Sequence, residues 1–319
     1  MGKPIKSERL SPGDTIGIVS PASPPADPTI IDRGVETLEN LGFRVSLARN
    51  VRNRLGFLSG SDRERAADLM GMFANPQIKA ILCVRGGYGC ARILSLLDYR
   101  FIRANPKILI GYSDITSLHC ALLRQANLVT FHGPTLNAGF IKPNPTPFAL
   151  QSFLRTLTRP AAPGSICAGY NRKTISIVRR GSASGRLVGG NLSLICTTVG
   201  TPYQPSFRDK ILFLEDIDEA PYRFDRMLTH LLNAGVLQQV AGIAVGLNKI
   251  CFDPKAKGAK EYRQSVDDVL NERLSPLKVP IVTGLPFGHV PLNATLPVGV
   301  RAELNGIKGD LLVTEAGVN

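Results

Sequence analysis

A serine at a sharp turn is the first group in this sequence that could do chemistry. Ser113 lies in Gly111-Tyr112-Ser113-Asp114, between the apolar run 107–110 and the segment 116–124, whose leucines have helical spacing. A serine at such a strand-to-helix turn projects from the sheet, close to backbone N–H groups at the positive end of a helix. This position suits a nucleophile that reacts through an oxyanion. Ile115 replaces the second glycine of the usual G-x-S-x-G turn, so a serine that only caps the helix is the alternative.

The search for a general base is short, because the chain has four histidines. His119 and His230 fall within helical patterns and are expected to be packed or on the surface. His132 follows an expected strand and could line a cleft. His289 lies in a loop rich in glycine and proline that leaves a strand, and such loops carry the active sites of α/β proteins. His289 is therefore the best candidate base, and a loop histidine with no role is the alternative.

A histidine that takes a proton from serine needs a carboxylate to orient its ring and to stabilise the imidazolium. Glu215 ends the apolar run 211–214 and begins the acidic stretch 215–219. That stretch could also be a solvated turn or a cation site, but no histidine lies near it and it lacks the spacing of a calcium loop. The order serine, acid, histidine is allowed for a triad, which would form in a cleft between two domains.

The glycine loop Gly86-Gly87-Tyr88-Gly89 precedes the serine turn by one expected βα unit. It lacks the third glycine of a dinucleotide fingerprint, and no acidic residue ends the next strand, so the loop is a poor candidate for a dinucleotide-binding site. A loop of this kind could present a backbone N–H to an oxyanion, with the N–H of Asp114 as the second donor.

The composition is that of a globular protein of two domains. The 319 residues are 44% hydrophobic and 20% charged, and no apolar run approaches the ~20 residues of a membrane span. The first residues lack the apolar stretch of a signal peptide. The scattered cysteines form no C-x-x-C pair, which predicts reduced core residues in a cytoplasmic protein. They are Cys83, Cys90, Cys120, Cys167, Cys196 and Cys251.

The formal net charge of +13 favours acidic partners in general. The basic residues are spread along the chain without interleaved aromatics, so we expect no nucleic-acid partner and no membrane partner. A solvated basic surface that weakly attracts a ligand rich in carboxylates is the simplest interpretation.

Strand and helix patterns alternate over the first 131 residues, which predicts a doubly wound parallel sheet. Asp27 is the expected cap of the first helix, and Ser61-Asp62-Arg63-Glu64 reads as a capping box that opens the second. Five prolines mark a linker at 142–164. The second part changes to short alternating strands, helices from 191 and from 222, and a final hairpin over 300–314. The predicted domains are therefore 1–141 and 165–319, the second mixed α+β and smaller.

These pieces together resemble the LD-carboxypeptidase family of serine peptidases, which includes the microcin-immunity peptidases. The resemblance covers nearly the whole chain, and the order and spacing of its motifs are highly specific. The motifs are Ser20-Pro21-Ala22-Ser23, Arg85-Gly86-Gly87-Tyr88-Gly89, Gly111-Tyr112-Ser113-Asp114-Ile115-Thr116, Phe131-His132-Gly133-Pro134, Gly190-Asn191-Leu192, Leu214-Glu215-Asp216, Pro221-Tyr222-Arg223-Phe224-Asp225-Arg226, Pro286-Phe287-Gly288-His289 and Leu296-Pro297-Val298-Gly299.

The resemblance implies a flavodoxin-like first domain and a homodimer. It implies Ser113 as nucleophile, His289 as base, Glu215 as orienting acid, and the backbone N–H groups of Gly87 and Asp114 as oxyanion hole. The implied reaction is cytoplasmic removal of terminal D-alanine from murein tetrapeptides, with no metal and no organic cofactor.

Two other functions stay open from the sequence. An immunity-type peptidase of the same fold would cleave a peptidyl-nucleotide toxin and should offer an aromatic ring to the base. The absence of tryptophan and the aromatic content of 6% count against it, although tyrosine or phenylalanine could serve. A non-catalytic binding module that uses 86–89 as an anion loop would require the serine, acid and histidine placements to be coincidental.

Overall fold

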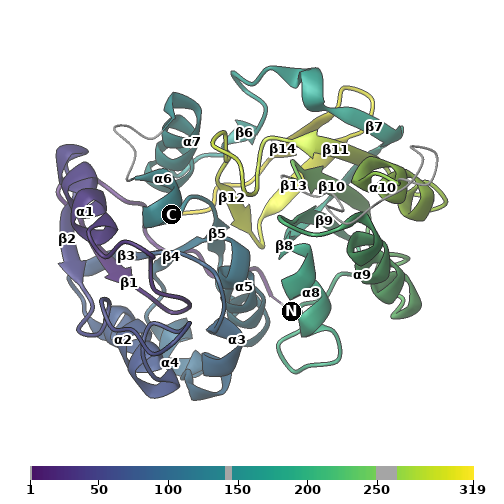
Figure 1. Ribbon diagram of the computed structural model, residues 1–319. Coiled ribbons are helices and arrows are strands. Elements are labelled where there is room, and N and C mark those ends of the chain that lie inside the picture. The colour runs from purple at the N-terminus through teal and green to yellow at the C-terminus, as the bar shows by residue number, and fades with distance from the viewer. Residues whose placement is uncertain (1, 141–145, 249–263) are drawn as a thin grey trace.

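Two β-sheets lie side by side, each covered by helices (Figure 1). The structure, a computed structural model, describes residues 2–140, 146–248 and 264–319. The first sheet has six strands in the order β12-β5-β4-β3-β1-β2, and every pair is parallel except β12 with β5. The second has eight strands in the order β6-β14-β13-β8-β9-β10-β11-β7 and is mixed. The predicted fold class, a doubly wound parallel sheet followed by a mixed α+β part, is confirmed, although the second part has the larger sheet and is not the smaller of the two.

The first sheet is built by βα units as the alternating pattern predicts. Its strands are β1 (Thr15–Val19), β2 (Arg44–Leu47), β3 (Ile78–Cys83), β4 (Ile108–Gly111), β5 (Thr130–His132) and β12 (Leu296–Val298). Its helices are α1 (Ile30–Asn40), α2 (Asp62–Ala74), α3 (Cys90–Ile93), α4 (Tyr99–Ala104), α5 (Thr116–Ala121), α6 (Leu136–Gly139) and α7 (Pro147–Thr158). Short 3-10 turns lie at Leu94–Leu96 and Ser113–Ile115, and a π-helical turn at Leu122–Ala126.

The second sheet has a parallel centre of β8, β9, β10 and β11 with antiparallel strands on both sides. Its strands are β6 (Gly164–Ser165), β7 (Ser176–Arg179), β8 (Ser182–Asn191), β9 (Lys210–Glu215), β10 (Gly242–Gly246), β11 (Ile281–Leu285), β13 (Arg301–Asn305) and β14 (Asp310–Val313). Its helices are α8 (Leu192–Thr198), α9 (Pro221–Asn233) and α10 (Val266–Leu274), with a 3-10 turn at Arg172–Thr174.

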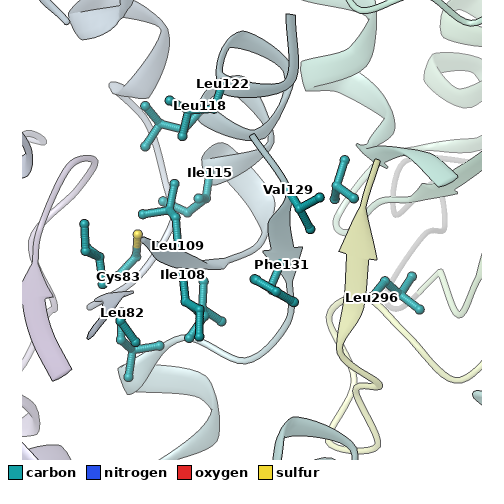
Figure 2. Close-up of a cluster of buried hydrophobic side chains, with 14 of the residues drawn as sticks. Leu82, Cys83, Ile108, Leu109, Ile115, Leu118, Leu122, Val129, Phe131 and Leu296 are labelled. Atoms are coloured by element: carbon teal, nitrogen blue, oxygen red, sulfur yellow. The ribbon is translucent and has the colours of Figure 1, made fainter. Parts of the chain in front are cut away.

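A continuous apolar core holds α5, the helix that follows Ser113, against the first sheet. Leu118 of α5 and the neighbouring Ile115 and Leu122 pack over Leu109 of β4 and other fully buried strand residues (Figure 2). Strands of parallel sheets are buried on both faces, which is why their sequences read as unbroken apolar runs. The helix that follows Ser113 is thus fixed by packing.

Three local expectations need correction. Asp27 does not cap the first helix: its carboxylate accepts from the Thr29 N–H at 2.9 Å, and α1 begins only at Ile30. The helical segment expected at 116–124 is α-helical only to Ala121 and continues as a π-helical turn. The antiparallel strand β12 was not expected in the first sheet, because a short Leu-Pro-Val run gives no periodic signal.

The predicted domain limits stay predictions. Residues 142–145 of the proposed linker lie outside the described residues, and its remainder contains the whole of α7. Between β11 and β13 the chain returns to the first sheet, where β12 pairs with β5. It returns again after β14, where the N–H of Asn319 donates to the Ser7 carbonyl at 2.9 Å. The two parts are therefore joined by several crossings of the chain.

Candidate active site

Ser113 has a left-handed backbone, with φ of +65°. Such a conformation in a residue other than glycine is characteristic of a nucleophile at a tight strand-to-helix turn. The turn needs a glycine before it, since a Cβ at Gly111 would lie 2.8 Å from the Ile115 side chain. Nε2 of the buried His119 lies 2.9 Å from the Gly111 carbonyl and donates to it. The turn that presents Ser113 is therefore fixed by the packing of Ile115 on Gly111 and by the hydrogen bond from His119.

His289 and Glu215 form a buried acid–base pair in the second part of the chain. Nδ1 of His289 donates to Oε2 of Glu215 at 2.6 Å, and the Glu215 side chain is fully buried. Glu215 ends β9, and His289 follows β11, so both stand at the carboxyl ends of parallel strands. Gly288 is required between them, because a Cβ there would lie 2.8 Å from Oε2. The bond fixes the tautomer in which Nε2 is free to accept a proton.

The serine turn docks directly against this pair. The Tyr112 ring lies 4.7 Å from the His289 ring, centroid to centroid. One turn further, Oγ1 of Thr116 accepts from the Asn191 N–H at 3.0 Å, across the junction of the two sheets. Gly190 permits this approach, since a Cβ there would lie 2.4 Å from the same oxygen. Residues far apart in the sequence are thereby brought to one place.

Ser113 Oγ makes no hydrogen bond within the described part of the chain, either to His289 or to another group. Catalytic hydrogen bonds are often long in a free enzyme and tighten when substrate binds. Ser113 itself is half-buried and open to a reacting group, and His289 is 14% exposed at its side chain.

The glycine loop 86–89 lies against Ser113. A Cβ at Gly86 would be 3.0 Å from Ser113 Oγ and 3.1 Å from the Asp114 nitrogen. Gly87 follows with φ of +106°, and its N–H donates to no group of the described chain. The two N–H groups predicted for the oxyanion hole, those of Gly87 and Asp114, thus belong to segments in close contact beside Ser113.

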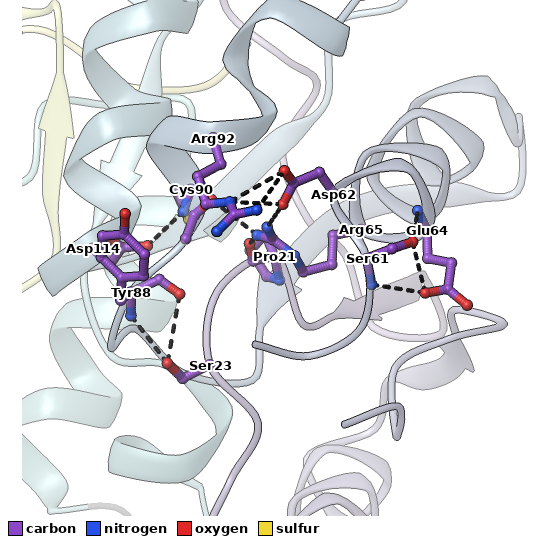
Figure 3. Close-up of polar contacts among 11 residues, drawn as sticks. Pro21, Ser23, Ser61, Asp62, Glu64, Arg65, Tyr88, Cys90, Arg92 and Asp114 are labelled. Carbon is purple, nitrogen blue, oxygen red and sulfur yellow. Dashed lines mark hydrogen bonds and ion pairs between the residues drawn. The ribbon is translucent and has the colours of Figure 1, made fainter. Parts of the chain in front are cut away.

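A polar network fixes the glycine loop to the rest of the first sheet (Figure 3). Ser23 accepts from the Tyr88 N–H at 3.1 Å, and the buried Arg65 donates to the carbonyls of Pro21 and Gly89. The Asp114 carboxylate accepts from the Cys90 N–H at 2.8 Å, and burial raises its pKa. The loop is held through the Tyr88 N–H and the Gly89 carbonyl, while the Gly87 N–H donates to no group of the described residues.

Sequence reasoning overlooked Asn191 and Asp216 as parts of this site. Asp216 accepts from the Asn191 amide at 2.8 Å and from the Ser193 N–H at 3.0 Å, at the start of α8. Burial raises the pKa of Asp216 to about 6. Asn191 lies opposite Glu215 in the β8–β9 register, so this network braces the acid. A buried polar cluster at two strand ends was the available signal.

The other histidines have different positions. His132 is fully buried among the rings of Tyr112, Phe213 and Phe287, and burial holds its pKa well below the ordinary value. It does not line an open surface, contrary to the expectation. His119 is packed and His230 is exposed, as expected.

Other expectations concern the cysteines, possible metal ligands and possible membrane helices of the described residues. Five cysteines are free, four of them buried, and Cys251 lies outside the described residues. The ranges 2–140, 146–248 and 264–319 contain no cluster of three or more His, Cys, Asp or Glu side chains suited to a metal ion. No helix in those ranges is long and apolar enough to cross a membrane.

Two family models match this chain and together span both sheets. The model of the LD-carboxypeptidase N-terminal domain matches residues 16–133, and that of the LD-carboxypeptidase C-terminal domain matches residues 184–304. The chain belongs to the LD-carboxypeptidase family. It is a serine-type carboxypeptidase, a hydrolase, and the interpretation as a non-catalytic binding module is thereby excluded.

Relatives of known name support the membership over almost the full length. A probable murein peptide carboxypeptidase of Bacillus subtilis is 39% identical over 98% of this chain and 95% of its own. The murein tetrapeptide carboxypeptidase of Pseudomonas aeruginosa is 32% identical over 95% and 97%. The microcin C7 self-immunity protein MccF of Escherichia coli is 30% identical over 98% and 96%.

Solved structures share the whole arrangement. MccF in complex with glutamyl sulfamoyl guanosine superposes with a TM-score of 0.89 at 27% identity, over 99% of this chain and 100% of that one. The muramoyltetrapeptide carboxypeptidase of Oxalobacter formigenes gives a TM-score of 0.79 at 31% identity, over 93% and 97%. Murein peptidases and immunity peptidases are thus both similar to this chain.

Proposed function

We propose that Ser113, His289 and Glu215 form the catalytic triad of this carboxypeptidase. The observation that carries the proposal is the 2.6 Å bond from His289 Nδ1 to the buried Glu215, with the His289 ring against the ring of Tyr112 in the serine turn. A base so oriented has its second nitrogen free for the serine proton. Gly87 and Asp114 are proposed as the oxyanion donors because their segments contact at Ser113.

The proposed reaction has two halves. Ser113 Oγ attacks the scissile carbonyl carbon while His289 Nε2 takes its proton, and the oxyanion is stabilised by the Gly87 and Asp114 N–H groups. The tetrahedral intermediate collapses, and His289 gives the proton to the departing amine. Water then attacks the acyl-enzyme, with His289 again as base, and Ser113 recovers its proton. Glu215 stabilises the imidazolium in both halves and keeps its own charge throughout.

The proposed substrate is murein tetrapeptide, from which the enzyme releases terminal D-alanine at an L,D bond. Support comes from the relatives named for murein peptides and from the basic charge of the chain, which suits a substrate with several carboxylates. The experiment is to incubate the purified protein with murein tetrapeptide and to measure released D-alanine. Turnover is expected, and its absence under conditions in which a murein tetrapeptide carboxypeptidase is active would contradict the proposal.

The second candidate is an immunity-type peptidase acting on peptidyl-nucleotides. It is favoured by the similarity to MccF and by an exposed aromatic pair, Phe57 and Tyr88, whose rings lie 5.6 Å apart beside the glycine loop. Such rings are able to stack on a nucleobase. Competition between tetrapeptide and an aminoacyl sulfamoyl nucleoside, compared by kcat/KM, separates the two functions.

The remaining expectations belong to this proposal. A role in recycling wall peptides requires the enzyme to act in the cytoplasm, and the free cysteines agree with a reducing compartment. We propose that the protein is a homodimer. We also propose that each chain has its two domains at 1–141 and 165–319. Light scattering on the purified protein measures the assembly, and a mass of one chain would contradict it.

A further inference from the structure

Arg85 is a half-buried cation without a counter-ion at the edge of the site. It follows β3 directly before the glycine loop, and its Nη1 donates to the Pro24 carbonyl at 3.2 Å. No carboxylate of the described residues forms an ion pair with it. Arg65 and Arg92, which flank the same loop, are both paired with Asp62. A guanidinium carries five N–H donors, so most of those of Arg85 stay available.

The Arg85 guanidinium lies against the glycine loop, on the face of Gly87 that Ser23 also contacts, and the next residue of the loop towards Arg85 contacts Ser113. A Cβ at Gly87 would lie 3.7 Å from Arg85 Nη2, and a Cβ at the adjacent Gly86 would lie 3.0 Å from Ser113 Oγ. The charge of Arg85 also acts on the Tyr112 hydroxyl, whose pKa it lowers against the stronger effects of burial and of Glu215. Arg85 therefore lies against the glycine loop, and its charge reaches Tyr112 of the serine turn.

A carboxypeptidase must recognise a free carboxylate very near the bond that it cleaves. In the C-terminal residue, one Cα separates that carboxylate from the scissile nitrogen, so its binding group must lie close to the oxyanion hole. A planar guanidinium matches a carboxylate with two parallel hydrogen bonds and stays charged at all relevant pH values.

We propose that Arg85 binds the free α-carboxylate of the substrate's C-terminal residue and thereby sets the preference for carboxypeptidase cleavage. This assignment rests on the proposed function, in which that residue is D-alanine. It gives a role to the one cation of the glycine-loop network (Arg65, Arg85 and Arg92) that has no acidic partner within the described residues.

The test compares two tetrapeptides that differ only in the C-terminal group, D-alanine or D-alaninamide. The wild-type enzyme should prefer the acid. Arg85→Met should lower kcat/KM for the acid by about 10- to 100-fold, as loss of a charge-assisted bond does, and change the amide much less. Arg85→Lys should recover part of the preference, because it restores the charge without the planar fork.

Arg54→Met is the matched control. Arg54 is exposed and donates to the neighbouring carbonyl of Pro25 at 2.6 Å, so its removal should leave both rates unchanged. The assignment would be overturned if Arg85→Met lowered kcat/KM equally for the acid and the amide, or if it kept the full preference for the acid. It would also be overturned if Arg54→Met lost the preference for the acid to the same degree. Wild-type enzyme that cleaves neither peptide would contradict the proposed function itself.

Discussion

Ser113 stores backbone strain where the chemistry is proposed to occur. A left-handed φ of +65° in a residue other than glycine costs roughly 1–2 kcal/mol, and the surrounding contacts must hold it. The carbonyl before the turn is bound by His119, and Gly86 lies against Ser113 Cβ. The strain therefore keeps the hydroxyl at the sheet edge, next to the proposed base and the two proposed oxyanion donors.

Because the proposed mechanism uses Ser113 and His289 in one step, the effects of their removal should be far from additive. His289→Ala should lower kcat by several orders of magnitude, nearly as much as removal of the serine, since a neutral hydroxyl is a poor nucleophile. The double variant Ser113→Ala/His289→Ala should then be hardly slower than either single variant. Steady-state kinetics on the tetrapeptide measures this, and multiplicative losses would show that the two residues act independently.

Glu215→Gln should reduce kcat severely but less than loss of the base. The amide accepts poorly from His289 Nδ1 in the required tautomer and cannot stabilise the charged ring. Glu215 Oε1 is buried without a partner in the described residues, so the change removes no other hydrogen bond. Asp267→Asn, at an exposed position of α10, is the control and should be neutral. Equal activity of Glu215→Gln and the wild type would remove the acid from the mechanism.

At the scale of elements, the contacts of one loop and one helix start decide the site. Gly86→Ala should force Ser113 or the Asp114 N–H out of position, because the new Cβ would lie 2.7 Å from Ser113 Cβ. We expect kcat to fall by about 100-fold, as a misplacement near 1 Å does. Gly71→Ala, in the interior of α2 with open space around it, should keep full activity. If both variants are equally active, the loop does not position the nucleophile.

Two buried histidines should make the fold sensitive to acid. Burial lowers the pKa of His119 to about 4 and that of His132 well below its usual value near 6.5. Below that value the unfolded chain binds more protons than the folded chain, so stability falls as the pH drops from about 7. Each histidine contributes at most about 1.4 kcal/mol per pH unit.

His132→Phe should flatten this dependence between pH 7 and pH 5, since a phenylalanine fits among the same rings and does not titrate. The measurement is the free energy of unfolding in urea at several pH values. His230→Gln, at an exposed position, should not change how the free energy of unfolding depends on pH. If the free energy of unfolding of His132→Phe depended on pH as steeply as that of the wild type, His132 would not be neutral in the folded protein.

Elements with local signals were predictable, and those with tertiary causes were not. The capping box at Ser61 is present, and Asn191 caps α8 as the position of the predicted helix implies. β12 could not be foreseen, because its pairing with β5 joins residues far apart in the chain. The fully buried Arg65 was also missed, since its role is to bind carbonyls of two loops that meet only in the fold.

At the scale of the whole molecule, the site is made by the meeting of two sheets. The first supplies Ser113 and the glycine loop at the ends of β4 and β3, and the second supplies Glu215 and His289 at the ends of β9 and β11. The order of residues along the chain allows the proposed triad, and its three proposed members all lie at or next to strand ends. The sequence could not show the direct contact of Thr116 with Asn191 that brings the halves together.

The central claim is that Ser113 is the nucleophile of a tetrapeptide carboxypeptidase, and D-alanine release by Ser113→Ala tests it most directly. The variant should fold normally, as judged by its thermal unfolding, and should still bind the tetrapeptide. Its kcat should fall by orders of magnitude, up to about 10⁶-fold, because no other group can form the acyl-enzyme. Retention of a tenth of the wild-type rate of D-alanine release would contradict the covalent serine mechanism.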